Sequence, residues 1–421
     1  MKMRLNLITA GLLAGLSFTA QAVDERAVLD HYADLAHAMY GDSLTAAKQL
    51  DQALEKLIAE PTEANLKAAR EAWKTARVPY QQTEAYRFGN AIVDDWEGKV
   101  NAWPLDEGLI DYVVPLYGEE SEENPFYTAN VIANPKLRLG GETIDASTID
   151  KALLADKLHE LDGVEANVAT GYHAIEFLLW GQDLNGTGPG AGERPASDFD
   201  AANCEVGHCD RRAAYLDAAS ELLIDDLEWI VDQWDDDGEA RNNLMDNDPS
   251  QGIASILTGM GSLSYGELAG ERMKLGIMLH DPEEEHDCFS DNTHWSHYYD
   301  VKGIHNVYTG QYTRLDGSEA TGPSLSDLVK AADAEADQDL RDHLNATLAK
   351  MQVLVDSAEK EGIAYDQLIG PGNDAGNAKV MAAVDALVAQ TRAIETAVAA
   401  LELDGIAIEG SDSLDAPEKV R

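Results

Sequence analysis

Apolar residues recur at intervals of three and four along almost the whole chain, and this periodicity limits what the chain can fold into. In one stretch, Leu50, Leu54 and Leu57 share one face of a helix among charged neighbours. Segments with this pattern are 23–59, 61–89, 149–161, 166–180, 211–234, 253–279, 325–360 and 378–403. Alternating, strand-like runs are few. Helices with one apolar stripe bury it against other helices, so the sequence predicts an all-α fold of helical-bundle architecture.

The length of the chain and its loop-like stretches indicate two domains. At 421 residues the chain is longer than one ordinary hydrophobic core supports. Residues 184–203 are rich in Gly, Pro, Ser and Asp, a composition typical of a linker or surface loop, and 94–140 is also expected to be loop-rich. The predicted division is a signal peptide at 1–22, a first bundle at 23–190, a linker or surface loop at 191–210 and a second bundle at 211–421.

The first residues are organised like a secretory signal peptide. Lys2 and Arg4 provide a positively charged start before an apolar stretch at 5–18. The tripeptide at 20–22, Ala-Gln-Ala, matches a small-residue cleavage site. The apolar stretch is short for a membrane-spanning helix. We therefore expect export to the bacterial periplasm or envelope.

Acidic residues far outnumber basic ones. The chain has 77 Asp and Glu against 31 Lys and Arg, which gives a formal net charge of −46. Such a surface repels nucleic acid and anionic membranes and attracts cations. The charge therefore argues against a nucleic-acid partner. Because the acidic residues are spread along the chain, it does not by itself locate a metal site.

Two of the three cysteines lie close together in the sequence. Cys204 and Cys209 flank a short loop, and in an oxidising compartment a local disulfide is expected. The alternative is a zinc site made by these two cysteines and His208, for which no fourth ligand is evident nearby. Cys288 is left unpaired, and the sequence does not assign its role.

The sharpest candidate for chemistry is the pair His173 and Glu176. Residues three apart on a helix lie on one face, so the imidazole and the carboxylate can point at a common atom. Gly171 just before them allows another backbone or a ligand to come close. The alternative is that the two side chains only form a hydrogen bond inside a packed interface.

A second group of polar residues lies between 288 and 305. His294 shares a helical face with His297, and Asp291 is a credible N-cap for the helix that follows. His305 lies further along the same segment. Asp291, His294 and His305 are therefore candidates to line a polar cleft, with capping or exposed roles as the alternative.

At these motifs the sequence resembles the imelysin family. Residues 171–183 contain the order Gly-x-His-x-x-Glu, which is similar to the GxHxxE signature of that family. Further similar segments are 77–89, 103–106, 209–216 and 288–294. The resemblance implies a two-domain fold of helical bundles, a periplasmic or outer-membrane-associated location and a link to iron uptake. Family members include iron-regulated envelope proteins and a group labelled as M75 peptidases.

The resemblance also assigns residues to a site. Carried over to this sequence, the motif implies that His173 and Glu176 bind a metal ion. Glu84, Arg87 and Asp106 lie in other matching segments and are expected to line the same cleft.

Iron is the metal that this ligand chemistry favours, because carboxylates and imidazole suit iron better than a thiolate site would. The sequence therefore predicts an envelope protein that binds iron, or a small iron chelate, for uptake at the domain junction. Zinc and calcium are alternative ions. A cation such as Arg87 in the cleft would favour an anionic chelate over a bare ion.

Two other functions are compatible with the sequence. The first is an M75-type metallopeptidase, in which metal-bound water attacks a peptide carbonyl. No His-Glu-x-x-His motif is present, and Phe177 stands where the inverted zinc motif requires His. The second is a metal-independent envelope protein that binds a peptide or an outer-membrane partner.

Overall fold

The computed structural model describes residues 23–118, 121, 124–139, 142–246 and 248–420. The predicted signal peptide at 1–22 lies outside the described residues. Helices dominate the described part of the chain, so the prediction of an all-α fold is confirmed. No helix in this part is both long and apolar enough to span a membrane.

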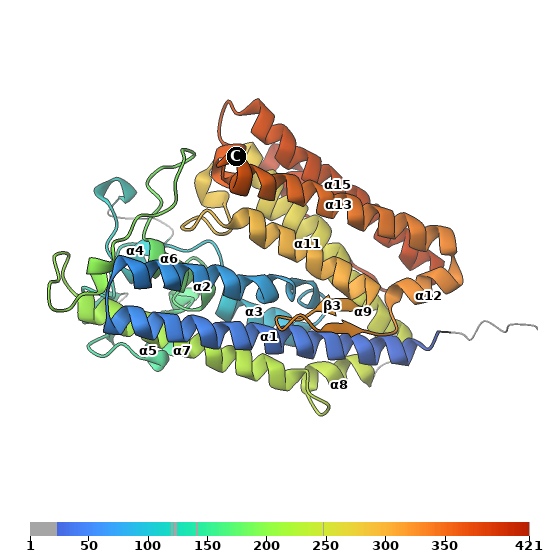
Figure 1. The fold of residues 1–421 in the computed structure, drawn as a ribbon, viewed down its shortest axis with the longest axis horizontal. Helices are drawn as coiled ribbons and strands as arrows, with labels where there is room; N and C mark the ends of the chain where they lie inside the picture. The colour runs from blue at the N-terminus through green and yellow to red at the C-terminus, as the bar shows by residue number, and fades with distance from the viewer. Residues whose placement is uncertain (1–22, 119–120, 122–123, 140–141, 247, 421) are drawn as a thin grey trace, which may run out of the picture.

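The N-terminal half of the chain forms a first helical bundle (Figure 1). Its elements are α1 (Glu25–Ala59), α2 (Glu63–Gln81), η1 (Glu84–Tyr86), α3 (Ala91–Asn101), α4 (Glu107–Ile110), η2 (Pro115–Tyr117), β1 (Lys136–Leu139), β2 (Glu142–Asp145), α5 (Lys151–Leu153), η3 (Leu154–Leu158), η4 (Leu161–Gly163), α6 (Gly171–Trp180), η5 (Ala196–Phe199), α7 (Cys209–Gln233) and α8 (Glu239–Met245). Helix α1 packs along α2 and α7, and α6 packs against both of these. Asp24 and Thr62 cap the first two helices by accepting hydrogen bonds from backbone N–H groups.

The C-terminal half forms a second bundle whose long helices cross the first at an angle (Figure 1). Its elements are α9 (Pro249–Ser262), η6 (Leu263–Lys274), α10 (Leu275–Leu279), η7 (Pro282–Glu284), α11 (Thr293–Thr309), β3 (Gln311–Thr313), β4 (Glu319–Thr321), α12 (Leu325–Ala332), α13 (Ala334–Glu361), α14 (Tyr365–Ile369), α15 (Asp374–Ala400), α16 (Asp412–Asp415) and η8 (Pro417–Lys419). Helix α13 packs along α11 and α15, and the π-helical segment η6 packs along α15.

The strands of the described residues form two small antiparallel hairpins. In the first, β1 pairs with β2 and Leu137 stands opposite Ile144. In the second, β3 pairs with β4 and Tyr312 stands opposite Ala320. The hairpins are small additions to the helical bundles and do not form a layer of their own.

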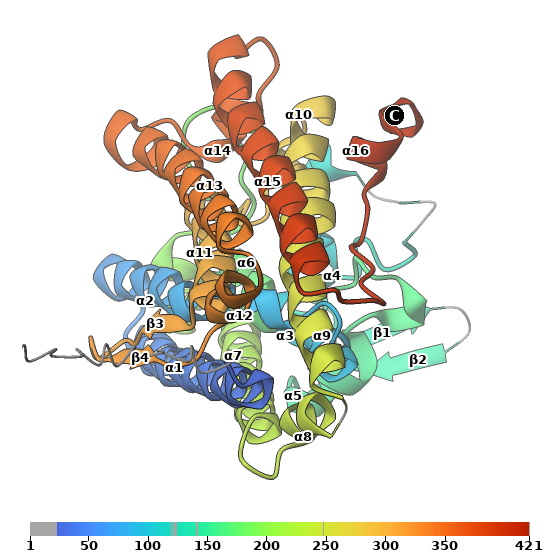
Figure 2. The same ribbon diagram turned by 90° about the vertical axis from the view of Figure 1, so that its right-hand side faces the viewer.

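Two stretches of helix join the bundles. Segments α9, η6 and α10 follow one another from 249 to 279, and their path runs from the first bundle into the second (Figure 2). Helix α9 packs on α1 and η1, whereas α11 packs on α2 on one side and on α13 on the other. A continuous set of buried apolar side chains extends through both bundles. The junction is therefore a packed interface.

The packing of α7 differs from the predicted division at residue 211. Helix α7 lies along α1 and α6 and so belongs with the first bundle. Periodicity shows that a helix has an apolar face, but it does not show which neighbour covers that face. We therefore propose that the second bundle begins at α9. The predicted linker at 191–210 also packs into the first bundle, because Arg194 is buried there.

Helix α3 is a second difference, because it begins just before the segment predicted to be loop-rich and continues into it. Val93, Trp96 and Val100 form its buried stripe. This stripe extends over only three turns, so its signal in the sequence is weak. The rest of 94–140 contains short helical turns and β1, with loops between them.

A disulfide joins Cys204 to Cys209 immediately before α7. Both sulfur atoms are therefore engaged with each other and do not form the alternative zinc site with His208. Cys288 has no disulfide partner and is partly buried.

A buried ion-pair network ties the loop around 194 to the first bundle. Asp111 accepts hydrogen bonds from Arg212 Nε at 2.6 Å and from Arg194 Nη1 at 2.7 Å, and all three side chains are about 1% exposed. Burial alone would raise the pKa of Asp111, but Arg194 and Arg212 outweigh it and hold the pKa below its usual value.

We predict that Asp111→Ala lowers the free energy of unfolding by about 3–5 kcal/mol, because it leaves two buried guanidinium groups without this counterion. Since the pKa of Asp111 is lower in the folded state, its contribution is present above its unfolded pKa and is lost as the pH falls through its folded pKa. Urea unfolding at neutral and acidic pH measures the free energy of unfolding of the wild type and the variant. Glu228→Gln, which removes an exposed pair with Lys48, is the control and should cost less than about 1 kcal/mol.

Close backbone contact fixes how α11 crosses the end of α2. A Cβ atom on Gly303 would lie 2.3 Å from the carbonyl oxygen of Gln82 and 2.9 Å from its Cα. Both are backbone atoms, so a side chain at 303 requires the two segments to move apart.

We predict that Gly303→Ala destabilises the protein by about 1–3 kcal/mol. Gly41→Ala in α1 is the matched control, because the nearest atom to its Cβ is 4.0 Å away. Alanine there should be neutral or stabilise the helix by up to about 1 kcal/mol. Equal effects of the two substitutions in thermal or urea unfolding would contradict the close contact.

Candidate metal site at the junction of the bundles

The start of α6 positions His173 and Glu176 inside the protein. Gly171 has φ +79°, and a Cβ atom there would lie 2.4 Å from the carbonyl oxygen of Val100 in α3. Any other residue would therefore push α6 away from α3. The close backbone approach expected at Gly171 is present. It places His173 and Glu176 where they are 1% and 0% exposed.

His173 and Glu176 form a directed pair. Their Nδ1 and Oε2 atoms are 2.9 Å apart. The other carboxylate oxygen of Glu176 accepts hydrogen bonds from the Ser290 backbone N–H at 3.0 Å and from the Ser290 hydroxyl at 2.6 Å. His173 Nε2 is buried and has no hydrogen-bond partner among the described residues. When Glu176 is ionised it can accept a hydrogen bond from the Nδ1–H group of neutral His173, and in that tautomer the Nε2 lone pair is free for a ligand.

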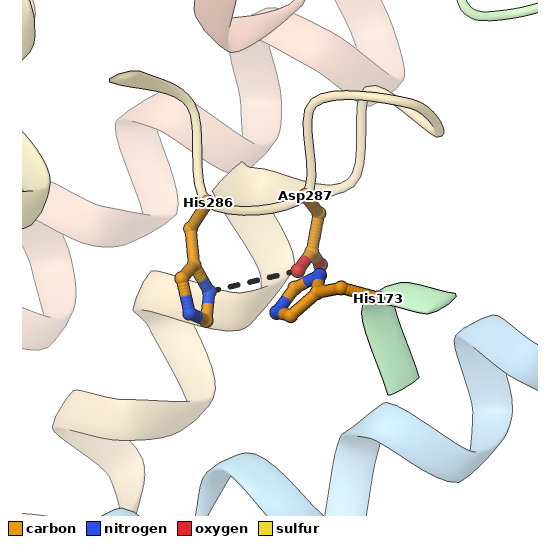
Figure 3. A group of neighbouring side chains, drawn as sticks. All are labelled: His173, His286 and Asp287. Carbon is orange, nitrogen blue, oxygen red and sulfur yellow. Dashed lines mark ion pairs between the residues drawn. The ribbon is translucent and has the colours of Figure 1, made fainter. Parts of the chain in front are cut away.

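Two further side chains reach the same place from the loop between η7 and α11. Donor atoms of His173, His286 and Asp287 all lie within 4.8 Å of one another. Figure 3 shows His286 and Asp287 projecting from this loop towards His173 at the start of α6. The rings of His173 and His286 meet edge to face, with their centroids 4.8 Å apart. Two imidazoles and one carboxylate are thus within reach of one metal ion.

Asp287 is held in place and kept charged. It pairs with Arg77 Nη2 at 2.9 Å and accepts a hydrogen bond from Asn292 at 2.9 Å and another from Ser296. Burial opposes ionisation of Asp287, but the charge of Arg77 and the hydrogen bonds from Ser296 and Asn292 hold the pKa of this carboxyl below its usual value. The site therefore contains a carboxylate anion at neutral pH.

Arg77 is itself fixed by neighbours in the first bundle. It donates a hydrogen bond from Nη1 to Asn101 Oδ1 at 2.5 Å. The rings of Trp73, Tyr80 and Tyr172 surround its guanidinium group at 5.1–5.6 Å. This rigid support from α2 and α3 fixes the position of Asp287 opposite α6.

Burial keeps the imidazoles of the site neutral. It lowers the pKa of His173 to about 3, an effect to which the positive charge of Arg77 adds. Burial likewise lowers the pKa of His286 well below its usual value, and Arg272 lowers it further. Neutral imidazole is the form that binds metal ions.

His286 connects the buried group to a pocket with an acidic wall. This pocket has a volume of about 540 Å³. Its charged and ionisable lining residues are Arg87, Glu97, Glu160, Glu165, Glu267, Glu271, Arg272, Glu283, Glu284 and His286. Carboxylates outnumber guanidinium groups in this list, so the pocket attracts cations and repels anions.

Glu84 and Arg87 are near this pocket but are engaged with other side chains. Glu84 pairs with Arg272 at 2.9 Å and accepts a hydrogen bond from Tyr80 at 3.1 Å. Arg87 lines the pocket and pairs with Asp94 at 2.8 Å, with Glu97 at 3.5 Å and with Glu267 at 3.7 Å. Arg87 is therefore neutralised by acidic neighbours and does not form an anion site.

The other residues selected from the sequence lie in different surroundings. Asp106 accepts a hydrogen bond from Asn124 at 2.5 Å. His294 pairs with Glu359 at 3.2 Å. His305 lies on α11 and is partly buried, and Asp291 belongs to a separate group of carboxylates. None of these four is among the donors grouped with His173.

Sequence reasoning did not select His286 and Asp287. The signal that could have found them is their position directly before the segment 288–294, which was recognised as a motif. His297 is a further buried histidine, with neither ring nitrogen hydrogen-bonded among the described residues. Its ring lies 6.5 Å from that of His286, so it borders the site.

Comparison with known proteins identifies one curated relative by sequence. Iron-regulated protein A of Synechococcus elongatus is 38% identical over 92 residues. These residues are 22% of this chain and 24% of that protein. The match therefore spans about a quarter of the relative's length.

Two crystal structures share the fold. A protein described as an iron-regulated protein A precursor, from Parabacteroides distasonis, has a TM-score of 0.63 at 18% identity, over 91% of this chain and 97% of that chain. An imelysin-like protein from Psychrobacter arcticum has a TM-score of 0.57 at 16% identity, over 91% and 98% of the two chains. At such identities the likeness establishes the fold alone.

The family profile described as imelysin, or peptidase M75, matches residues 36–394. This range includes most of the first bundle, the GxHxxE segment and most of the second bundle. Because the match covers most of the chain, the resemblance seen in the motifs is confirmed, and this protein belongs to the imelysin family.

Proposed function

We propose that this protein captures iron in the cell envelope, with His173, His286 and Asp287 as ligands at the junction of the bundles. The observation that carries the proposal is the meeting of these three donors within 4.8 Å of one another. In this assignment Glu176 orients His173 through Nδ1, while His173 Nε2 faces the ion.

The kind of ligand favours ferrous iron. Two histidines and one carboxylate are the donor set that non-haem Fe(II) proteins use with open coordination positions. No cysteine belongs to this donor group among the described residues, which makes a soft-metal site a poorer fit. The iron-regulated relative from Synechococcus elongatus supports an iron-related role for this protein.

The acidic pocket favours a bare cation over an anionic chelate. Its carboxylates would repel a negatively charged iron complex, and Arg87 is already paired with Asp94, Glu97 and Glu267. The cation would reach the buried donors through His286, which lines the pocket. Capture of a free or weakly complexed ion is therefore the form of binding that we propose.

The arrangement of Glu176 favours binding over peptide hydrolysis. A metallopeptidase needs a base that activates water beside the metal. One oxygen of Glu176 faces His173, and the other accepts two hydrogen bonds from Ser290. Glu176 is thus engaged as a support for His173 and is poorly placed to take a proton from water.

We predict that substitutions of the two histidine ligands reduce iron binding more than substitution of the supporting carboxylate Glu176 does. His173→Ala and His286→Ala should abolish stoichiometric iron binding, whereas Glu176→Gln should weaken it by about 10–100-fold, the usual cost of losing a partner that orients a ligand. The measurement is metal content and affinity of tag-free protein, loaded anaerobically with Fe²⁺, Zn²⁺, Mn²⁺ or Ca²⁺ at matched free concentrations.

His343→Ala is the matched control, because His343 is partly exposed on α13 and pairs only weakly with Asp339 at 3.5 Å. It should bind iron like the wild type. Equal loss in Glu176→Gln and His173→Ala would make Glu176 a direct ligand. Unchanged iron binding in both histidine variants would refute the site and favour a metal-independent role in binding a peptide or an envelope partner.

A further inference from the structure

A second group of acidic side chains includes two residues of the loop that carries His286 and Asp287. Carboxylate oxygens of Glu285, Asp291 and Asp366 all lie within 4.8 Å of one another. Glu285 immediately precedes His286, Asp291 lies just before α11, and Asp366 is in α14. The group therefore connects the loop 285–291 with the second bundle.

The buried members of this group lack partners. Asp366 is 0% exposed, and neither of its carboxylate oxygens makes a hydrogen bond that meets ordinary geometric limits among the described residues. Glu285 is 1% exposed, and neither of its carboxylate oxygens makes a hydrogen bond that meets ordinary geometric limits. A buried carboxylate without a partner is costly, so these oxygens require either a proton or a cation.

Among the described residues, no arginine or lysine forms an ion pair with Glu285, Asp291 or Asp366, in contrast to the pairing of Asp287 with Arg77. Burial and then the charge of Asp183 raise the pKa of Asp291 to about 7, against a smaller opposing effect of Lys74. When these carboxylates ionise, no ion-pair partner among the described residues balances their charge, and a bound cation would do so.

We propose that Glu285, Asp291 and Asp366 form a second cation site that binds calcium. All three donors are oxygens, and such a set selects a hard cation over one that prefers imidazole or thiolate. Calcium accepts irregular arrangements of six to eight oxygen ligands, including backbone carbonyls and water, more readily than magnesium does. Three converging carboxylates on a loop and a short helix suit that tolerance.

The consequence of binding at this site is mechanical. A cation shared by Glu285, Asp291 and Asp366 fixes both ends of the loop 285–291 to α14. Ordering of this loop does not depend on the proposed role of His173, so the calcium site stands apart from the iron proposal. The two sites can be tested separately because none of the carboxylates of one is a donor of the other.

The test is calcium binding to the tag-free, metal-stripped full chain, by equilibrium dialysis and by thermal unfolding with added Ca²⁺ or Mg²⁺. The wild type should bind one Ca²⁺ at this site, and its Tm should rise with calcium concentration. The same concentrations of magnesium should raise the Tm less. In Asp366→Asn the calcium-dependent rise should disappear. The Tm of the metal-free variant should be no lower than that of the wild type, because a repelling charge has been removed.

Asp291→Asn provides a second variant in a more exposed position, and it should also lose the calcium response. Asp374→Asn at the exposed start of α15 is the matched control and should keep it. His173→Ala should retain the response as well, which separates this site from iron capture. No calcium-dependent Tm rise in the wild type, or an unchanged rise in both Asp366→Asn and Asp291→Asn, would overturn the proposal.

Discussion

The buried ion pair between Arg77 and Asp287 is the interaction on which the junction depends. Arg77 belongs to α2 of the first bundle, whereas Asp287 lies in the loop before α11 of the second, and both side chains are at most 2% exposed. A buried charge without a counterion is strongly destabilising. The pair therefore fixes where the second bundle can sit on the first, and it fixes the carboxylate opposite His173 at the same time.

The surroundings of this pair show which polar groups are satisfied and which are not. Asp287 and Glu176 have partners at both carboxylate oxygens, whereas His173 Nε2 has none among the described residues. Most buried polar atoms in proteins are hydrogen-bonded. His173 thus has one unpartnered ring nitrogen and groups with a second histidine and a charged carboxylate, and His286 also lines the acidic pocket. These features support the metal site that we propose.

The sequence predicted the helical class and two residues of the candidate site, because both depend on short-range spacing. Gly171, His173 and Glu176 lie within two helical turns, and the three-residue separation of His173 and Glu176 places both on one helical face. His286 and Asp287 could not be derived in this way, since a loop brings them to α6 from more than a hundred residues away. For the same reason periodicity detected α7 but not its place beside α1, and it missed α3, whose stripe is short.

The most direct test of the account is anomalous diffraction at the iron absorption edge, from crystals of protein loaded anaerobically with Fe²⁺. The account predicts one anomalous peak within bonding distance of His173 Nε2, a nitrogen of His286 and an oxygen of Asp287, with Glu176 still on His173 Nδ1. A peak coordinated by Glu176 in place of Asp287, or a fully occupied iron position away from His173, would contradict it.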